Sequence, residues 1–370
     1  MVNMECVKLK SFIENITEKD NEYIKRLKEC KNNGYKTYIW GNGEGADNAE
    51  IRSDGFEFNG RLVNRRFLAD DTSDTKCFED ILENCNTRIN LVIAFKGFKE
   101  EFITPWKSKI AVLVDMDCFS GNMNVGTSEI TYDYIMDNEK KFQDVYEALA
   151  DDKSRDSLVA YINQKISLKY GFLEKVYIEN QYFNPEVMPL KEGEVFVDCG
   201  AYNGDSAEAF IREQNKRGIG EYKKIISFEP DPNSFQELQG KHILNHICIN
   251  KGTSDKREEL KFSTIGTSSG INQKGEYTIE TTTIDEVVLG EATLIKMDVE
   301  GAELSSLKGA EKCIKDNKPK LAICIYHKRE DPWQIYEYIK SLVPGYRFYI
   351  RAHEKEAIEL VLYAIYEGEN

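Results

Sequence analysis

The hydrophobic positions of this 370-residue chain change their spacing along its length. In residues 1–33, Phe12, Ile16, Tyr23 and Leu27 recur at the three- and four-residue intervals that predict an amphipathic helix. Residues 35–115 hold short apolar runs separated by polar stretches of helical length. These runs are 37–40, 62–67, 91–95 and 110–114. Apolar strands that alternate with helices predict a small parallel α/β domain of the Rossmann-like kind.

A helical pattern returns at 129–175, where Ile135, Phe142 and Leu149 mark one face. Prolines and a glycine then interrupt the chain before residue 195. We therefore predict three parts. They are an N-terminal helix with a small α/β domain at 1–125, a helical linker at 126–190 and a second α/β domain at 191–370.

The second α/β domain has a more regular pattern. Strand-like runs lie at 195–198, 224–229, 243–249, 293–298 and 320–326, and helical stretches follow most of them. A polar hairpin region at 260–282 interrupts the series. Two final strands, 346–351 and 359–366, are joined by a short turn and must run antiparallel. The sequence thus predicts a doubly wound sheet with an antiparallel strand at its end.

Composition narrows the function. The net charge of −15, from 49 Lys and Arg against 64 Asp and Glu, disfavours binding to nucleic acid. No apolar run is long enough for a membrane span or a secretory signal, so we expect a cytoplasmic protein. The nine cysteines form no C-x-x-C pair and histidine occurs four times. We therefore predict no metal cluster and no disulfide framework.

The first motif that carries chemistry is the segment VFVDCGAYNGD, residues 195–205. A buried strand ends at Asp198, and Gly200 and Gly204 follow before a helix. Glycine lets the backbone approach a ligand closely, and the start of the helix presents free N–H groups. An acidic first residue suits the cationic sulfonium of S-adenosylmethionine better than the pyrophosphate of a dinucleotide. We predict cofactor contacts from Asp198, Gly200, Ala201, Tyr202, Gly204 and Asp205.

The second motif is the segment ISFEPD, residues 226–231. Glu229 ends a predicted strand, where its carboxylate can accept both ribose hydroxyls of an adenosine. We therefore predict cofactor contacts from Glu229 and Pro230. A surface carboxylate at a strand end is the alternative.

The third motif, the segment LIKMDVEGAE at 294–303, brings Asp298, Glu300 and Glu303 to the end of another strand. Clustered carboxylates repel, so one can have a raised pKa suited to base chemistry. His327 follows the next strand and is able to take a proton from a hydroxyl. We predict Asp298, His327 and Glu300 as catalytic residues. The alternatives are that the glutamates favour a helix N-terminus and that the histidine is structural.

The N-terminal domain holds a second glycine segment, Gly41 to Gly45, directly after a predicted strand. Ala46 stands at the third glycine position of a dinucleotide fingerprint, which alanine sometimes occupies. No apolar helical pattern follows. We therefore expect a structural turn rather than a nucleotide site.

Several separated segments resemble the FkbM-type methyltransferases. They are VFVDCGAYNGDSAEAF, SFEPDPNSF, TTTIDEV, LIKMDVEGAELSSLKGA and PKLAICIYHKREDPW, within residues 191–366. The resemblance implies methyl transfer to an oxygen of a sugar, glycan or polyketide-like product. It carries cofactor roles onto Asp198, Gly200, Gly204 and Glu229. Cys199 departs from the Ile or Val of many relatives.

Taken together, we predict an S-adenosylmethionine-dependent O-methyltransferase with a Class I sheet, strand order 3-2-1-4-5-7-6, and a small-molecule or glycan acceptor. Tyr182 and Phe183 are candidates for a lid or for packing. Two alternatives remain open at this stage. One is a scaffold protein that keeps the fold without turnover. The other is a nicotinamide-dependent sugar enzyme that uses the glycine segment after residue 40.

Overall fold

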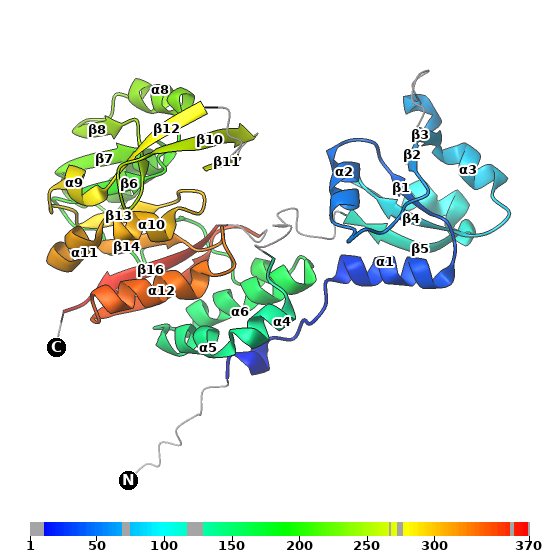
Figure 1. The fold of residues 1–370 in the computed structure, drawn as a ribbon, viewed down its shortest axis with the longest axis horizontal. Helices are drawn as coiled ribbons and strands as arrows, with labels where there is room; N and C mark the ends of the chain where they lie inside the picture. The colour runs from blue at the N-terminus through cyan, green and yellow to red at the C-terminus, as the bar shows by residue number, and fades with distance from the viewer. Residues whose placement is uncertain are drawn as a thin grey trace, which may run out of the picture. The chain divides into compact units, whose positions relative to one another are not determined.

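The computed structural model describes residues 11–68, 75–116, 129–265, 268–271, 277–355 and 359–368. Its chain forms two compact units (Figure 1). The N-terminal unit comprises Ile16–Asp137 and Ile162–Phe172, and the C-terminal unit comprises Met1–Asn15, Asn138–Tyr161 and Leu173–Asn370. The domain limits expected from the sequence are 1–125, 126–190 and 191–370. That these three parts fold independently remains a prediction.

The N-terminal unit contains one parallel sheet in the order β3-β2-β1-β4-β5. Its strands are β1 (Thr37–Trp40), β2 (Arg61–Val63), β3 (Thr75–Cys77), β4 (Ile89–Ile93) and β5 (Ile110–Asp115). Its α-helices are α1 (Glu22–Asn33), α2 (Glu44–Ile51), α3 (Phe78–Asn84) and α4 (Tyr132–Asp137), and α6 (Asp152–Ser167) contributes its last residues. Both faces of the sheet are covered, Ile39 and Val92 packing in one core cluster and Trp40 and Leu91 in the other. Such two-sided burial is typical of parallel sheets.

A helix follows the first glycine segment, although no apolar helical pattern indicates one there. Helix α2 begins at Glu44, immediately after Gly43. Its buried apolar residues are two alanines, Ala46 and Ala49, which produce little hydrophobic periodicity. A search for periodic large apolar side chains therefore does not indicate this helix.

The C-terminal unit is built on a seven-stranded sheet in the order β15-β16-β14-β13-β6-β7-β8. The strands are β6 (Val195–Cys199), β7 (Lys224–Phe228), β8 (His246–Ile249), β13 (Leu294–Met297), β14 (Lys320–Cys324), β15 (Tyr346–Ala352) and β16 (Leu360–Tyr366). Counted from β6, this is the predicted order 3-2-1-4-5-7-6. Strand β16 runs antiparallel to both β14 and β15. The predicted doubly wound sheet with its antiparallel strand is confirmed.

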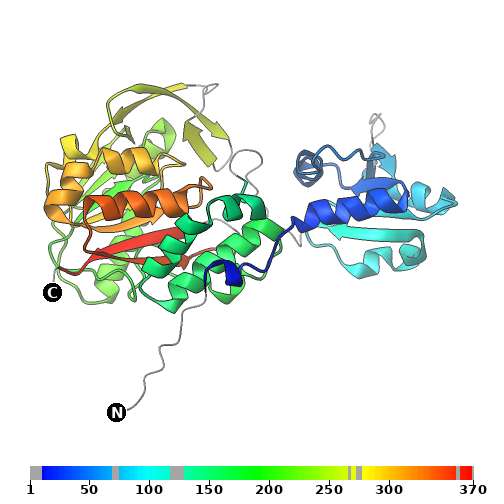
Figure 2. The same cartoon turned by 60° about the horizontal axis from the view of Figure 1, so that its bottom comes forward.

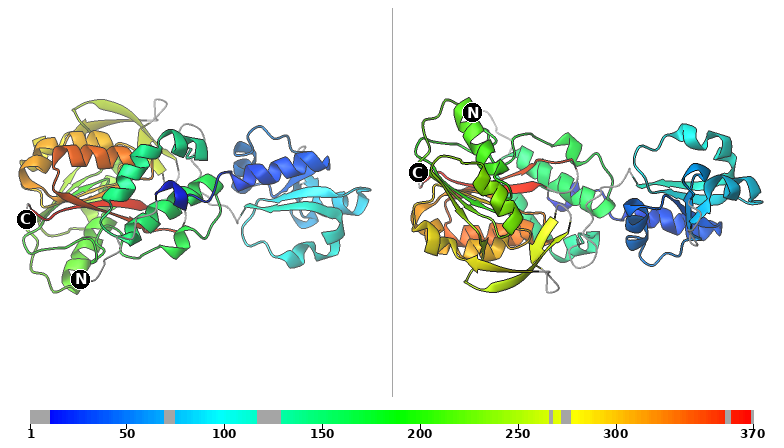
Figure 3. Two further views of the ribbon diagram at one scale, coloured as in Figure 1. Left: turned by 90° about the horizontal axis from the view of Figure 1, so that it is seen from below. Right: turned by 90° about the horizontal axis from the view of Figure 1, so that it is seen from above.

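Helices cover both faces of this sheet, with α7 on one face and α10 to α12 on the other (Figure 3). The helices of the unit are α5 (Glu139–Ala148), the first residues of α6, α7 (Asp205–Lys216), α8 (Pro232–Gly240), α9 (Ile284–Val288), α10 (Glu303–Lys308), α11 (Glu311–Asn317) and α12 (Asp331–Leu342). Among the described residues, no helix has the length and apolar character required to cross a membrane.

Two details differ from the predicted pattern. The polar region at 260–282 takes part in a separate four-stranded sheet, β11-β10-β12-β9, rather than a single hairpin. Its strands are β9 (Gly252–Thr253), β10 (Glu259–Ile265), β11 (Ser268–Ile271) and β12 (Tyr277–Thr282). The helical stretch that follows the predicted strand at 293–298 is divided into α10 and α11 at Gly309. A Cβ at Gly309 would lie 2.0 Å from the carbonyl oxygen of Ser254, so the backbones touch there.

Residues 138–161 form a helical segment that precedes the seven-stranded sheet in the sequence. A buried ion pair holds this segment to the edge strand β15. Arg351, 1% exposed, donates to the two carboxylate oxygens of Asp151 at 3.1 and 2.6 Å and to the Ser154 hydroxyl at 2.6 Å. Helix α5 packs against α12 beside it (Figure 2). Residues 138–161 are thereby part of the unit that carries the seven-stranded sheet.

Candidate functional site

A cavity of about 350 Å³ lies at the carboxyl ends of β6, β7, β13 and β14. This is where ligands bind in open α/β sheets. The predicted residues Gly200, Tyr202, Asp205, Glu229 and Pro230 line it, as do Asp298 and Glu300. The fold therefore brings together side chains that were predicted from motifs up to 100 residues apart.

The glycine loop after β6 depends on close backbone contacts. Gly200 has a φ of +75°, and a Cβ there would lie 1.8 Å from the carbonyl oxygen of Asp298. Gly204 has a φ of +90°, and a Cβ would lie 2.9 Å from Cδ1 of Leu238. Glycine is required at both positions because other residues rarely adopt this conformation. The loop lies directly against the strand end that carries Asp298.

Asp198 does not line the cavity. It is fully buried, where its carboxylate accepts a 2.5 Å hydrogen bond from the Ser206 hydroxyl and lies 3.2 Å from Nζ of Lys296. Lys296 also donates to the carbonyl oxygen of Gly200 at 2.6 Å. Burial raises the pKa of Asp198, against the lowering effect of Lys296. Asp198 and Lys296 together hold the glycine loop, and a direct cofactor contact from Asp198 stays a prediction.

Lys296 remains charged in this setting. Burial lowers the pKa of its amine, but Asp198 and Asp298 raise it further, so the pKa lies above its ordinary value. Its charge therefore offsets one of the carboxylates around it.

Glu229 lies at the end of β7 and is 6% exposed. One carboxylate oxygen accepts the N–H of Tyr202 at 2.8 Å, and the other accepts the N–H of Asp231 at 2.8 Å. Each oxygen keeps a second lone pair for a ligand donor. Burial raises the pKa of Glu229 to about 7. The backbone fixes this carboxylate at the wall of the cavity.

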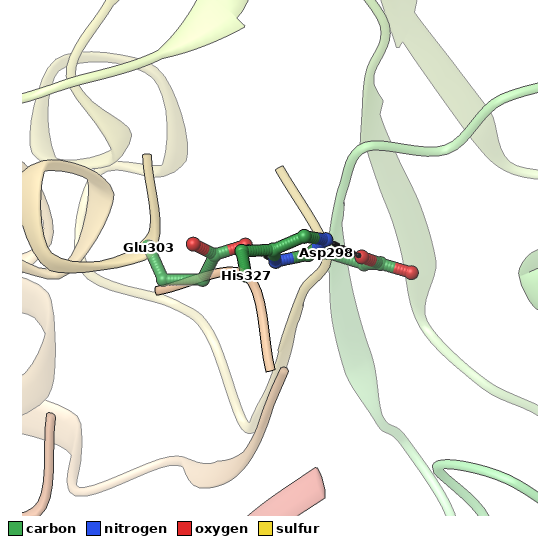
Figure 4. Close-up of side chains that lie close together, drawn as sticks. All are labelled: Asp298, Glu303 and His327. Carbon is green, nitrogen blue, oxygen red and sulfur yellow. Dashed lines mark ion pairs between the residues drawn. The ribbon is translucent and has the colours of Figure 1, made fainter. Parts of the chain in front are cut away.

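Behind the cavity, His327 lies between the carboxylates of Asp298 and Glu303 (Figure 4), and the carboxylate of Glu300 lies near it as well. Its Nδ1 is 2.9 Å from Oε1 of the fully buried Glu303, and its Nε2 is 3.5 Å from both Asp298 Oδ1 and Glu300 Oε2. Burial lowers the pKa of His327, but Glu303, Asp298 and Glu300 raise it more, to about 9. The imidazole is therefore charged at neutral pH and compensates the surrounding carboxylates.

The carboxylates of this cluster differ in their acidity. Burial raises the pKa of Asp298, but Lys296 and His327 outweigh it, so the pKa is lowered. Burial raises the pKa of Glu300, whose side chain is 42% exposed and whose φ is +53°. Asp298 and Glu300 line the cavity, whereas His327 and Glu303 do not.

The structure adds residues that the motifs did not reveal. The Tyr182 hydroxyl donates to Asp298 Oδ2 at 2.8 Å, and the Tyr326 hydroxyl lies 3.3 Å from Oδ1. Gln181 donates to Glu359, and both line the cavity with Tyr182 and Tyr326. Of the predicted lid pair, Tyr182 reaches the cavity, whereas Phe183 packs in the core against Phe196. Tyr326 is the neighbour of His327 in the sequence, which is the one signal that could have indicated it.

Two groups among the described residues have ligand-type atoms within 4.8 Å of one another. They are Asp298, Glu303 and His327, and Asp298, Cys324 and Glu359. In the first group, the imidazole already bridges two carboxylates as an ion-paired cation. Hydrogen bonding and ion pairing account for this geometry without a metal, and the predicted lack of one stays a prediction.

Residues 198–354 match the family model of the methyltransferase FkbM domain. This region is an FkbM methyltransferase domain. A crystal structure of the methyltransferase FkbM from Methylobacillus flagellatus KT is similar to the chain, with a TM-score of 0.72 at 22% sequence identity. The match covers 95% of each chain. At 22% identity this similarity shows the fold alone, and it extends over nearly the whole chain.

A second solved structure, an rRNA methylase from Streptococcus thermophilus, covers 48% of this chain and 89% of its own. Its TM-score is 0.32 and its identity 16%. None of the curated proteins compared with the chain matches it. The family and the fold of the FkbM domain support S-adenosylmethionine-dependent methylation in general.

Proposed function

We propose that the C-terminal unit transfers a methyl group from S-adenosylmethionine to a hydroxyl oxygen of a sugar, glycan or natural-product acceptor. The observation that carries this proposal is one cavity that joins the glycine loop, Glu229 and the carboxylates Asp298 and Glu300. Of its lining residues, all within the described part of the chain, Lys296 is the one cation, and it is paired with Asp198. An acidic wall suits a cationic sulfonium.

The residues fit an adenosyl ligand. Glu229 presents two carboxylate oxygens at the cavity wall, where they can accept the ribose hydroxyls. The backbone from Gly200 to Tyr202 and the start of α7 lie beside it, and Tyr202 is 56% exposed. We assign Gly200, Tyr202, Asp205, Glu229 and Pro230 to the cofactor wall. Ala201 and Gly204 do not line the cavity, and we assign them to the shape of the glycine loop and Asp198 to its support.

The bound cofactor would supply an electrophilic methyl group on sulfur. The chain then has to align an acceptor hydroxyl and take its proton as the O–CH₃ bond forms and the S–CH₃ bond breaks. Asp298 faces the cavity with both oxygens fixed by tyrosine hydroxyls, so it orients the acceptor. Glu300 receives the proton, because its pKa is raised and its partly exposed carboxylate can pass the proton to solvent.

His327 acts from behind these two carboxylates. Its charge keeps Asp298 ionised, and the ion pair with Glu303 fixes the orientation of the ring. We therefore propose Glu303 as a positioning residue that acts through His327. Asp298, Glu300 and His327 remain the candidates for the chemistry.

The geometry of the first glycine segment supports a structural role there. A Cβ at Gly45 would lie 2.3 Å from the carbonyl oxygen of Ala94, and a Cβ at Gly41 would lie 3.0 Å from the same atom. These glycines thus permit close packing against the end of β4. A nicotinamide site at this position would instead require binding of NAD that survives deletion of residues 191–370.

The acceptor class is tested by a product-mass screen of sugars, glycans and hydroxylated natural products with labelled S-adenosylmethionine. We expect a mass increase of one methylene on a hydroxyl-bearing acceptor. Cofactor binding without methylation of any acceptor would instead favour the scaffold alternative.

All seven described cysteines are free thiols, which supports a reducing compartment such as the cytoplasm.

A further inference from the structure

Glu359 is a carboxylate in the cavity of the C-terminal unit that the proposed methyl transfer does not use. It lies directly before β16 and is partly buried, and it lines the cavity together with Asp298 and Tyr326. Burying a carboxylate is costly unless hydrogen bonds compensate it. The contacts of Glu359 therefore indicate what a ligand at this place would supply.

Two side chains of the cavity wall contact this carboxylate. The amide of Gln181 donates to Oε2, and the hydroxyl of Tyr326 lies 3.5 Å from Oε1. The same hydroxyl lies 3.3 Å from Oδ1 of Asp298, and its single proton can be donated to one of the two carboxylates at a time. An ionised carboxylate accepts about four hydrogen bonds, so Glu359 retains capacity for a ligand donor.

The charge around Glu359 defines that donor. Burial and the nearby carboxylate of Asp298 raise the pKa of Glu359, against the lowering effect of the Gln181 amide. A hydrogen-bond donor in the ligand favours the ionised form, whereas a negatively charged ligand group would be repelled by both carboxylates. An uncharged hydroxyl therefore suits this position, and a phosphate or a carboxylate does not.

The separation of the two carboxylates indicates how hydroxyls fit between them. One oxygen of Glu359 and one oxygen of Asp298 lie within 4.8 Å of each other. Each would hold a donating hydroxyl at about 2.6 Å, the usual length of a hydrogen bond from a hydroxyl to a carboxylate. Since both carboxylates line one cavity, hydroxyls that reach them from inside it converge. Two hydroxyls on adjacent carbons of a ring match this arrangement, whereas hydroxyls on opposite sides of a ring diverge.

Cys324 completes the group of ligand-type atoms within 4.8 Å, but it does not line the cavity. Burial and the charge of Asp298 raise the pKa of its thiol, so the sulfur stays protonated at neutral pH. The thiolate, not the thiol, is the form that binds metals. The carboxylates of Asp298 and Glu359 are therefore better suited to hydroxyl groups than to a metal ion that Cys324 would share.

We propose that Glu359, held by Gln181, accepts a hydrogen bond from a second hydroxyl of the acceptor, on the carbon next to the one whose hydroxyl Asp298 orients. The acceptor is then a vicinal diol, as in a sugar ring, and Glu359 determines this specificity. A natural product with an isolated hydroxyl lacks the second contact. This inference rests on the proposed methyl transfer and narrows the class of its acceptor.

The test compares the rates at which the full chain methylates cis- and trans-1,2-cyclohexanediol with its rates on cis- and trans-1,4-cyclohexanediol, using labelled S-adenosylmethionine. The two pairs have the same composition, and the 1,2 forms cover both arrangements of adjacent hydroxyls. We expect kcat/KM for the better 1,2-diol to exceed that for either 1,4-diol at least about tenfold, the effect of one charge-assisted hydrogen bond.

Glu359→Gln keeps the size of the side chain and removes its charge, and it should reduce this ratio of rates to near unity. Glu367→Gln is the matched control, because Glu367 is an exposed glutamate after the end of β16 that pairs with Arg347 outside the cavity. The control should keep the native ratio. Gln181→Met removes the donor that holds Glu359 and should also lower the ratio, and it serves as the second variant should Glu359→Gln lose its fold by circular dichroism.

Three results would overturn the inference. They are equal rates on the 1,2- and 1,4-diols, methylation of neither diol, or a native ratio in the folded Glu359→Gln and Gln181→Met variants. The affinity for S-adenosylmethionine and the product-mass screen report on the proposed methyl transfer itself. Methylation of another acceptor together with any of these three results would leave that function standing, so the two failures are distinguishable.

Discussion

Glu229 illustrates how a single residue can be assigned before its surroundings are known. Its position after an apolar run indicated a carboxylate at the carboxyl edge of a sheet. The structure adds the two backbone N–H groups that hold it and the burial that raises its pKa to about 7. That pKa makes its cofactor role sensitive to pH in an accessible range.

We expect the affinity for S-adenosylmethionine to rise with pH through about 7 and then level off. The pKa of Glu229 is raised, so the folded chain keeps this proton below pH 7, and only the ionised carboxylate can accept from both ribose hydroxyls. At pH 6 the affinity should be about tenfold below its plateau. Glu229→Gln should bind weakly and without this pH dependence, as calorimetry at several pH values can measure. A native pH profile in the variant would refute the ribose assignment.

His327 gives a second residue-level prediction, on stability. Its folded pKa of about 9 exceeds the unfolded value of about 6.5, so its contribution is fully present below about pH 6.5. The contribution is lost as pH rises through 9, and its size is on the order of 3 kcal/mol. Between pH 7 and 9, urea unfolding should show native stability falling. In His327→Gln the fall should be much smaller. An equal fall in both proteins would mean that His327 does not hold its proton as described.

The contacts of the carboxylate network that the sequence did not reveal have a common cause. Tyr182, Tyr326 and Glu359 contact one carboxylate network from segments that are far apart in the chain. Their meeting depends on β16 lying next to β14, which no local pattern encodes. Asp198 was predicted from its motif, but the sequence did not indicate that its carboxylate is buried and paired with Lys296.

The glycine loop after β6 leaves no room for a side chain at Gly200. We expect Gly200→Ala to abolish cofactor binding and to lower stability by about 2 kcal/mol or more, because its Cβ would overlap the Asp298 carbonyl. Gly240→Ala, at the end of α8 with nothing within 4 Å of its Cβ, is the control and should change stability by less than about 1 kcal/mol. Equal behaviour of the two variants in melting and titration experiments would contradict this account.

The ion pair of Arg351 gives a prediction about how an element is attached. Asp151→Asn leaves the guanidinium buried without its charge partner, so we expect a loss of about 2 kcal/mol, discounted because Asp151 is partly exposed. Asp152→Asn, whose side chain is 88% exposed, should change the free energy of unfolding very little. Chemical denaturation measures both. Equal losses would mean that this pair does not hold the helical segment to β15.

Elements were predictable where large apolar side chains recur. The strands of the C-terminal sheet followed from apolar runs and one tight turn, and their order followed from the likeness of this pattern to a Class I methyltransferase sheet. Helix α2 and the division at Gly309 did not, because small residues and tertiary contacts determine them. A polar region such as β9 to β12 gives no periodic signal of its pairing.

For the whole molecule, an FkbM methyltransferase domain is joined to an N-terminal parallel α/β unit, and each unit has its own cavity. The chain passes between the units more than once, and α6 contributes residues to both. A single boundary in the sequence therefore cannot separate the two units, because each unit contains segments that are far apart in the chain. The proposed methyl transfer belongs to the C-terminal cavity, and the family match of residues 198–354 supports it.

The most direct measurement is calorimetric titration of the full chain with S-adenosylmethionine at pH 8, beside Glu229→Gln. We expect saturable binding at micromolar concentrations, and an affinity at least about tenfold lower in the variant, whose fold should be intact. No binding to the native chain at high micromolar ligand would contradict the proposal that this domain is an S-adenosylmethionine-dependent enzyme.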